Sequence, residues 1–142
     1  MAKEIEKMVW SNSLSIGNVF VDNDHKKLFD ICNELVDLVE LNKDRKEFAK
    51  ILSEMTDYAR THFKKEESYM KAFSYPEISE HIKSHHEYIR KVAMDNFHFM
   101  SPDPPDPVEI ITFIKIWWSN HILYCDIKYE NYKKRVQANA NY

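Results

Sequence analysis

Apolar side chains recur at helical spacing over four stretches of the chain, and each stretch ends at a polar or proline-containing break. A repeat near 3.6 residues predicts an amphipathic helix with one buried face. Asp22 or Asn23 is the expected N-cap residue of the first helix, and Asp44 that of the second. The four predicted helices lie at about 23–41, 45–72, 76–99 and 108–136.

The breaks between these helices are short. The segment 101–107 holds four of the five prolines, so it predicts a stiff turn or loop. Four amphipathic helices with short connections predict a single all-α domain, an antiparallel up-down-up-down four-helix bundle. Residues 1–20 have no sustained period, and we expect an N-terminal arm across the bundle, with Trp10, Ile16, Val19 and Phe20 as its apolar contacts. Residues 137–142 are expected to be frayed.

Composition narrows the possible functions. The chain has 142 residues with one glycine, which excludes glycine-rich phosphate loops, and its net charge of −3 offers nothing to nucleic acid or an anionic membrane. Cys32 and Cys125 are far apart and predict neither a disulfide scaffold nor a thiolate zinc site. No secretory signal or membrane-crossing run is recognisable, so the expected location is the reducing cytoplasm.

Polar residues occupy the faces that should be buried. His62 and Glu66 are spaced i, i+4 on the second helix, and His81 and His85 are spaced i, i+4 on the third. His121 lies on the apolar face of the fourth helix. One such histidine is more often a hydrogen-bonded core residue, and His62 with Glu66 could equally form a surface pair. Taken together the positions favour a shared site, because buried polar groups need partners.

These residues, with His25 near the start of the first helix, fall near one end of the predicted bundle. Imidazole and carboxylate ligands without thiolate favour iron or manganese, and six or more ligands suit two cations. Asp126 is harder to place, because it follows His121 by five residues, about 140° around an ideal helix. Periodicity alone does not favour it over Glu67 or Asp22.

The order and spacing of these residues resemble the hemerythrins, and the bacterial single-domain branch is the most similar. The resemblance extends from Trp10 to about Tyr129. It rests on Asp22-x-x-His25-Lys26-x-Leu28-Phe29, His62-Phe63-x-x-Glu66-Glu67-x-x-Met70, Tyr75-Pro76 followed by His81-x-x-x-His85, and Trp117-x-x-x-His121-Ile122-x-x-x-Asp126.

The resemblance implies a four-helix bundle with a non-haem di-iron centre that binds O₂ reversibly. One iron would be held by His81, His85 and His121, and the other, with one position open to O₂, by His25 and His62. Glu66 and Asp126 would bridge the two irons beside an oxo or hydroxo group. Matching positions imply an apolar O₂ pocket, for which plain core packing is the alternative; its residues would be Leu28, Phe63, Trp117, Trp118 and Ile122.

Some positions depart from the family pattern. Asp24 stands where glutamine is usual, which changes the hydrogen bonding expected beside His25. Trp118 is bulkier than the leucine of many members. We interpret Cys125 as a small buried hydrophobic residue rather than a ligand, and we expect His86 and His98 to be exposed.

The function that the resemblance implies is O₂ carriage, storage or delivery to an oxidase, without enzymatic activity. Two alternatives remain open at this point. The domain could sense O₂, redox state or nitric oxide for a signalling partner, or the same irons could support peroxidase-like or nitric oxide-reducing activity.

Overall fold

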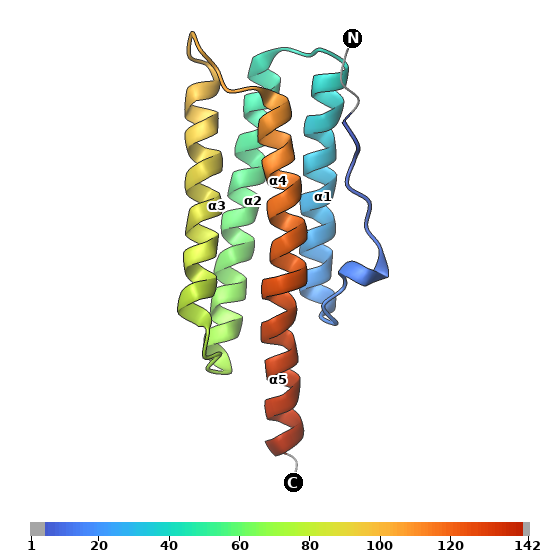
Figure 1. Ribbon diagram of the computed structural model, residues 1–142, viewed down its shortest axis with the longest axis vertical. Coiled ribbons are helices and arrows are strands. Elements are labelled where there is room, and N and C mark those ends of the chain that lie inside the picture. The colour runs from blue at the N-terminus through green and yellow to red at the C-terminus, as the bar shows by residue number, and fades with distance from the viewer. Residues whose placement is uncertain (1–4, 141–142) are drawn as a thin grey trace.

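Four long helices run alternately up and down the molecule, and their connections lie at its two ends (Figure 1). The computed structural model describes residues 5–140, and within that range it contains no strand. The predicted all-α antiparallel bundle is therefore confirmed. The elements are η1 (Asn12–Leu14), α1 (Val19–Glu40), α2 (Arg45–Ala72), α3 (Ile78–Phe99), α4 (Pro107–His121), η2 (Ile122–Asp126) and α5 (Ile127–Ala140).

The start of α1 differs from the sequence prediction. Its cap is Asn18, whose side chain accepts hydrogen bonds from the backbone N–H groups of Phe20 and Val21. Asp22 and Asn23 therefore lie inside the helix. Val19 and Phe20 also belong to α1 and are largely exposed, so their predicted role as buried contacts of an arm is wrong.

The remainder of the predicted arm packs along α1. Ile16 is buried, and Trp10 meets Phe29 edge-on with 5.6 Å between ring centroids. Gly17, at a φ of 81°, turns the chain into α1, a backbone conformation that glycine adopts without strain. Residues 1–4 of the predicted arm lie outside the described residues.

The apolar faces of the four helices meet in one core. The face of α2 that helical spacing predicts to be buried is buried along its whole length, and His62 and Glu66 are as buried as its apolar residues. These are Phe48, Leu52, Met55, Ala59 and Met70. Leu35, Leu52 and Ile111 are fully buried in a part of the core that contains neither His62 nor Glu66. Side chains of this size each contribute about 2 kcal/mol when removed from water, which stabilises the packing of the helices in this part of the core.

The fourth predicted helix is not one uniform α-helix. Between α4 and α5 the chain forms one wider turn, the π-helix η2, in which the N–H of Ile127 donates to the carbonyl of Ile122. The α5 helix then extends past the end of the bundle (Figure 1) and stays helical to Ala140, so the frayed end expected from 137 onward is wrong as far as 140. Val136, which helical spacing puts on the apolar face of the predicted helix 108–136, is 40% exposed on this extension. Residues 141–142 lie outside the described part.

Among the described residues, no helix combines the length and the apolar character needed to cross a membrane.

The cap geometry yields a stability test. Asn18→Ala removes the acceptor of two backbone N–H groups, so we expect a loss of about 1 kcal/mol of unfolding free energy, or roughly 3 °C in Tm. Asn23→Ala is the matched control, because Asn23 is exposed inside α1 and alanine is the better helix former. Thermal unfolding followed by circular dichroism measures both variants. If only Asn23→Ala destabilised the protein, Asn23 would be the cap residue, as inferred from the sequence, and Asn18 would not.

Candidate metal centre

Five imidazole rings and two carboxylates form a continuous polar layer across the bundle. His25 comes from α1, His62 and Glu66 from α2, His81 and His85 from α3, His121 from the end of α4 and Asp126 from η2. All seven are at most 5% exposed. The structure therefore brings together every residue that the sequence singled out as a metal ligand.

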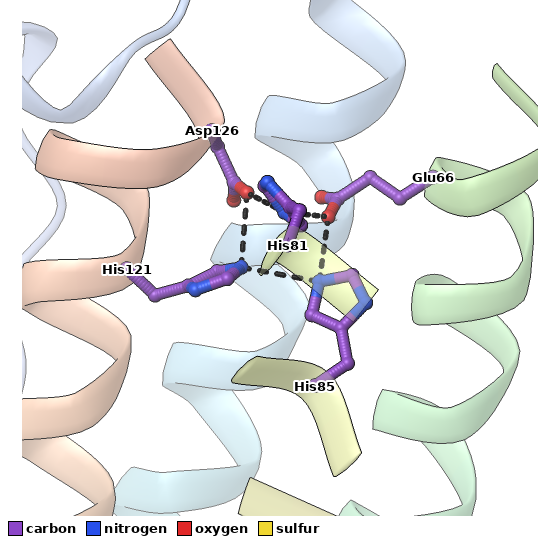
Figure 2. A group of neighbouring side chains, drawn as sticks. All are labelled: Glu66, His81, His85, His121 and Asp126. Carbon is purple, nitrogen blue, oxygen red and sulfur yellow. Dashed lines mark hydrogen bonds and ion pairs between the residues drawn. The ribbon is translucent and has the colours of Figure 1, made fainter. Parts of the chain in front are cut away.

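The larger group contains three imidazoles and both carboxylates, Glu66, His81, His85, His121 and Asp126 (Figure 2). His81 Nε2 lies 3.2 Å from Glu66 Oε1 and 3.0 Å from Asp126 Oδ1. His85 Nε2 lies 3.1 Å from Glu66 Oε1, and His121 Nε2 lies 3.1 Å from Asp126 Oδ1. Three ring nitrogens thus converge with one oxygen from each carboxylate.

The smaller group contains two imidazoles and the same two carboxylates. His62 Nε2 lies 2.8 Å from Glu66 Oε2, and His25 Nε2 lies 3.1 Å from Asp126 Oδ2. Each carboxylate therefore offers one oxygen to the larger group and its second oxygen to the smaller group. This arrangement is the one expected of two carboxylates that bridge a pair of cations.

Several of these atoms are close without being hydrogen bonded, which tests whether a metal fits. His25 Nε2, His62 Nε2, Glu66 Oε2 and both oxygens of Asp126 are buried without a hydrogen-bond partner. His62 Nε2 and Glu66 Oε2 are 2.8 Å apart, which is a normal hydrogen-bond distance. They form no hydrogen bond because the two groups are not aligned for one. Buried polar atoms normally find partners, and here they point toward shared centres instead. Nitrogen and oxygen donors without thiolate fit a pair of first-row transition-metal ions.

The wide turn of η2 explains how Asp126 joins the layer. In an ideal α-helix, five residues beyond His121 would point well away from it, which is why periodicity did not select Asp126. The π-helical turn contains one additional residue, so residues five apart return to nearly the same face. Such turns occur frequently at functional sites.

Charge balance in the layer is visible in its pKa values. Burial alone would lower the pKa of His62 and His121, but the nearby carboxylates outweigh it and raise both to about 10. Burial likewise opposes protonation of His81, yet Asp126 and Glu66 raise its pKa to about 9. Burial disfavours the charged carboxyls, but the imidazoles hold the pKa of Glu66 and of Asp126 below the usual range. Without cations, the two carboxylates therefore hold protons on the histidines.

Outer hydrogen bonds orient the rings. His62 Nδ1 donates to Asp24 Oδ2 at 2.9 Å, and His85 Nδ1 donates to Glu67 Oε2 at 2.8 Å. Tyr58 donates its hydroxyl proton to Asp24 Oδ1 at 3.0 Å. Carboxylates that accept from the outer nitrogen fix the tautomer that leaves Nε2 free for a metal. The sequence did not identify Tyr58 or this role of Glu67, because neither stands at ligand spacing.

Aromatic rings enclose the layer on its apolar side. Phe63 stacks on His85 with 3.8 Å between centroids and lies 5.4 Å from Trp118. Trp118 is 5.9 Å from His25 and 6.0 Å from His62, so it borders the smaller group. Trp117 instead stacks on His121 at 4.3 Å, beside the larger group, and is only partly buried. Leu28 and Ile122 are fully buried, as expected of pocket or core residues.

Residues outside the layer fall mostly where the sequence placed them. His86 and His98 are exposed, as predicted. Cys32 and Cys125 form no disulfide. Cys125 is only half-buried rather than buried, and a hydrogen bond with His121 lowers the pKa of its thiol.

Comparison with known proteins agrees with the fold and the cluster. Residues 17–126 match the family described as the hemerythrin HHE cation binding domain. The chain is similar to a bacteriohemerythrin of Clostridium acetobutylicum, with 30% identity over 85% of this chain and 97% of that protein. It is 28% identical to a bacteriohemerythrin of Stenotrophomonas maltophilia over 94% of this chain and 84% of the relative. A crystal structure of wild-type hemerythrin superposes with a TM-score of 0.81 at 28% identity, covering 87% of this chain and 95% of that one.

The pKa shifts predict how stability depends on pH. In the metal-free protein His62, His81 and His121 have folded-state pKa values above their unfolded value, so their contribution is complete below about pH 6.5 and lost as pH rises through 9 to 10. We expect the Tm of chelator-treated protein to fall by at least about 5 °C between pH 6.5 and 9.5. Metal-loaded protein should show little of this loss, because a bound cation already holds these imidazoles unprotonated. Equal pH dependence with and without metal would contradict this account.

The Asp24 carboxylate should strengthen metal binding at His62. Asp24→Asn removes the negative charge behind the ring while leaving an oxygen acceptor, and we expect affinity for the second metal equivalent to fall about tenfold. Competitive titration against a chromophoric chelator measures this affinity. Asp30→Asn, an exposed carboxylate on the same helix, is the matched control and should change nothing; equal affinities for both variants would remove Asp24 from the site.

Proposed function

This chain belongs to the hemerythrin family, and on that premise we propose that it binds O₂ reversibly at two iron ions held in the polar layer. The observation that carries the proposal is the pair of donor groups that share Glu66 and Asp126. A lone structural cation would need four donors, whereas seven donors with two shared carboxylates suit two cations. The family supports iron as the cation, and the donor set is compatible with it.

We assign the donors by the group in which each lies. His81, His85 and His121 would hold one iron, and His25 and His62 would hold the other, with Glu66 and Asp126 bridging them. The second iron has one fewer imidazole, so it would keep a position for O₂. The described bundle would thus act as a single domain with one di-iron centre.

When bound, the iron pair would supply the electrons that make O₂ attachment reversible. The chain supplies the surroundings in which this can occur. Phe63 and Trp118, with Leu28 and Ile122 buried nearby, would exclude water from the apolar side of the smaller group, and we propose these residues as the O₂ pocket. Trp117 lies beside the larger group, so we propose for it an outer position in that wall. A dry wall restricts proton delivery and so slows irreversible oxidation.

A small cavity of about 180 Å³ between α1 and α2 reaches the same donors from the other side. Its lining includes Asp24, His62, Glu66 and Lys65. Solvent would approach the open iron here, and the carboxylate of Asp24 at this approach is held deprotonated by the His62 hydrogen bond, which lowers its pKa. We propose carriage, storage or delivery of O₂ in the cytoplasm, without catalysis, as the use of the site.

Metal analysis combined with optical spectra before and after O₂ tests this proposal. We expect about two irons per chain and, when the reduced protein meets air, a visible charge-transfer band that disappears under argon. Zinc as the sole metal, or an iron protein without such a band, would contradict O₂ binding. Rapid decay of the band with peroxide turnover would instead favour a catalytic role.

Two histidine variants locate the site within the chain. His62→Ala should lose the iron of the smaller group and O₂ binding together. His86→Ala is the control, because His86 is exposed on α3 and belongs to neither donor group. Normal O₂ binding by both variants would show that the ligand assignment is wrong.

A further inference from the structure

A groove of about 730 Å³ lies between α2 and α3, on the outer side of the bundle. We call it the α2–α3 groove; the residues used below are Arg60, Lys64, Ile89, Arg90, Met94 and Phe97. Its volume lies within the range of about 300–1,000 Å³ found for small-molecule sites. None of these six residues belongs to the proposed iron ligands.

The groove is positively charged although the chain as a whole is not. Arg60, Lys64 and Arg90 line it, and within residues 5–140 none of the three forms a salt bridge. The single carboxylate in its lining, Glu67, already accepts a hydrogen bond from His85 Nδ1. The net charge of the chain is −3, so this positive potential is a local feature. An anionic group would be attracted here.

Besides the charged groups and three histidines (His85, His86 and His98), the lining is apolar, and part of its apolar surface is unusually exposed. Phe97 is 80% exposed and Met94 is 53% exposed, and their i, i+3 spacing puts them on one face of α3. Ile89 continues the apolar wall toward the metal layer. Apolar surface that is concave and rimmed by charge is typical of a ligand site.

The charged and apolar parts are separated along the groove. Asn96 on α3 donates to Ser53 on α2, which sets the register of the two antiparallel helices. Arg60 follows Ser53 by seven residues on α2, and Ile89 precedes Asn96 by seven residues on antiparallel α3, so Arg60 and Ile89 lie at the same level. Arg90 is the next residue after Ile89 and therefore lies at nearly the level of Arg60. Phe97 lies about 10 Å farther along, given a rise of about 1.5 Å per residue. The ligand should therefore carry an anionic end and an apolar tail.

We propose that the α2–α3 groove binds an anionic amphiphile, a carboxylate on an unbranched hydrocarbon chain. Its carboxylate lies between Arg60 and Arg90, with Lys64 beside it, and the hydrocarbon chain runs from there along Met94 to Phe97. Guanidinium groups match a carboxylate with paired hydrogen bonds. The hydrocarbon chain of the ligand covers the apolar wall, which would otherwise be in contact with water. The residues that would hold the ligand are not iron ligands, although His85 and Phe63 also line the groove.

Isothermal titration calorimetry of the metal-loaded protein with dodecanoate, at concentrations below those at which dodecanoate self-associates, tests the proposal. We expect one dodecanoate per chain. Arg60→Gln and Arg90→Gln should each weaken binding about tenfold, as expected for loss of a charge-assisted hydrogen bond. Phe97→Ser should weaken binding by removing an apolar contact with the hydrocarbon chain. Arg60→Lys keeps the charge but loses the paired hydrogen bonds, so it should weaken binding less than Arg60→Gln does.

Control variants and control ligands make the result decisive. Arg135→Gln removes an exposed arginine on α5, outside the groove, and should leave binding unchanged. Dodecyltrimethylammonium, with the same tail and opposite charge, and acetate, with no tail, should bind far more weakly. Absence of dodecanoate binding, equal binding of the alkylammonium ion, or unchanged affinity in the arginine variants would each overturn the proposal. The iron content and optical spectrum of every variant should equal those of the parent, which separates this result from the fate of the di-iron centre.

Discussion

The structure depends on the burial of two carboxylates, Glu66 and Asp126, at the same depth in an otherwise apolar core. Two negative charges removed from water are strongly destabilising unless positive charge or aligned donors surround them. Five imidazoles surround them here, contributed by all four long helices, so every helix must reach this layer in the correct register. The negative charge of the two carboxylates can be neutralised either by protons on the histidines or by bound cations. The donors that lack aligned hydrogen bonds indicate that cations are the arrangement for which the layer is built.

This requirement explains features at some distance from the layer. Asp24 and Glu67 stand behind the rings of His62 and His85, where they hold the outer nitrogens and keep the inner ones directed toward the centre. Phe63 and Trp117 stack on His85 and His121 with interplanar angles of 10° and 13°, which restricts rotation of these rings. Apolar packing in the remainder of the core supplies the free energy that a polar layer cannot. The residues placed around the site thus serve to fix the orientation of the imidazole rings.

Much of this arrangement could be predicted from the sequence, and the exceptions have physical causes. The i, i+4 pairs His62 with Glu66 and His81 with His85 follow directly from helical geometry, as does the buried stripe of α2. Asp126 could be chosen only by resemblance, because residue periodicity assumes an α-helix and carries no signal for the π turn η2. Asn18 was missed as a cap because Val19 and Phe20, which start α1, are exposed apolar residues that interrupt the expected pattern. Contacts such as Tyr58 with Asp24 join separate helices and leave no trace in local spacing.

The two donor groups share both carboxylates but differ in their number of imidazoles, and this inequality is the physical basis of the proposal that one iron would keep an open position. The larger group has three imidazoles; Trp117 stacks on His121, which lines a cavity of about 270 Å³, and His85 borders the α2–α3 groove. The smaller group has two imidazoles; Trp118 borders it, and the small cavity beside Asp24 reaches its donors from solvent. On the proposed assignment, the smaller group is the one that would keep a coordination position free, because it has two imidazoles against three. The shared carboxylates would then connect that position to the second cation, so that both metals would respond to one bound molecule.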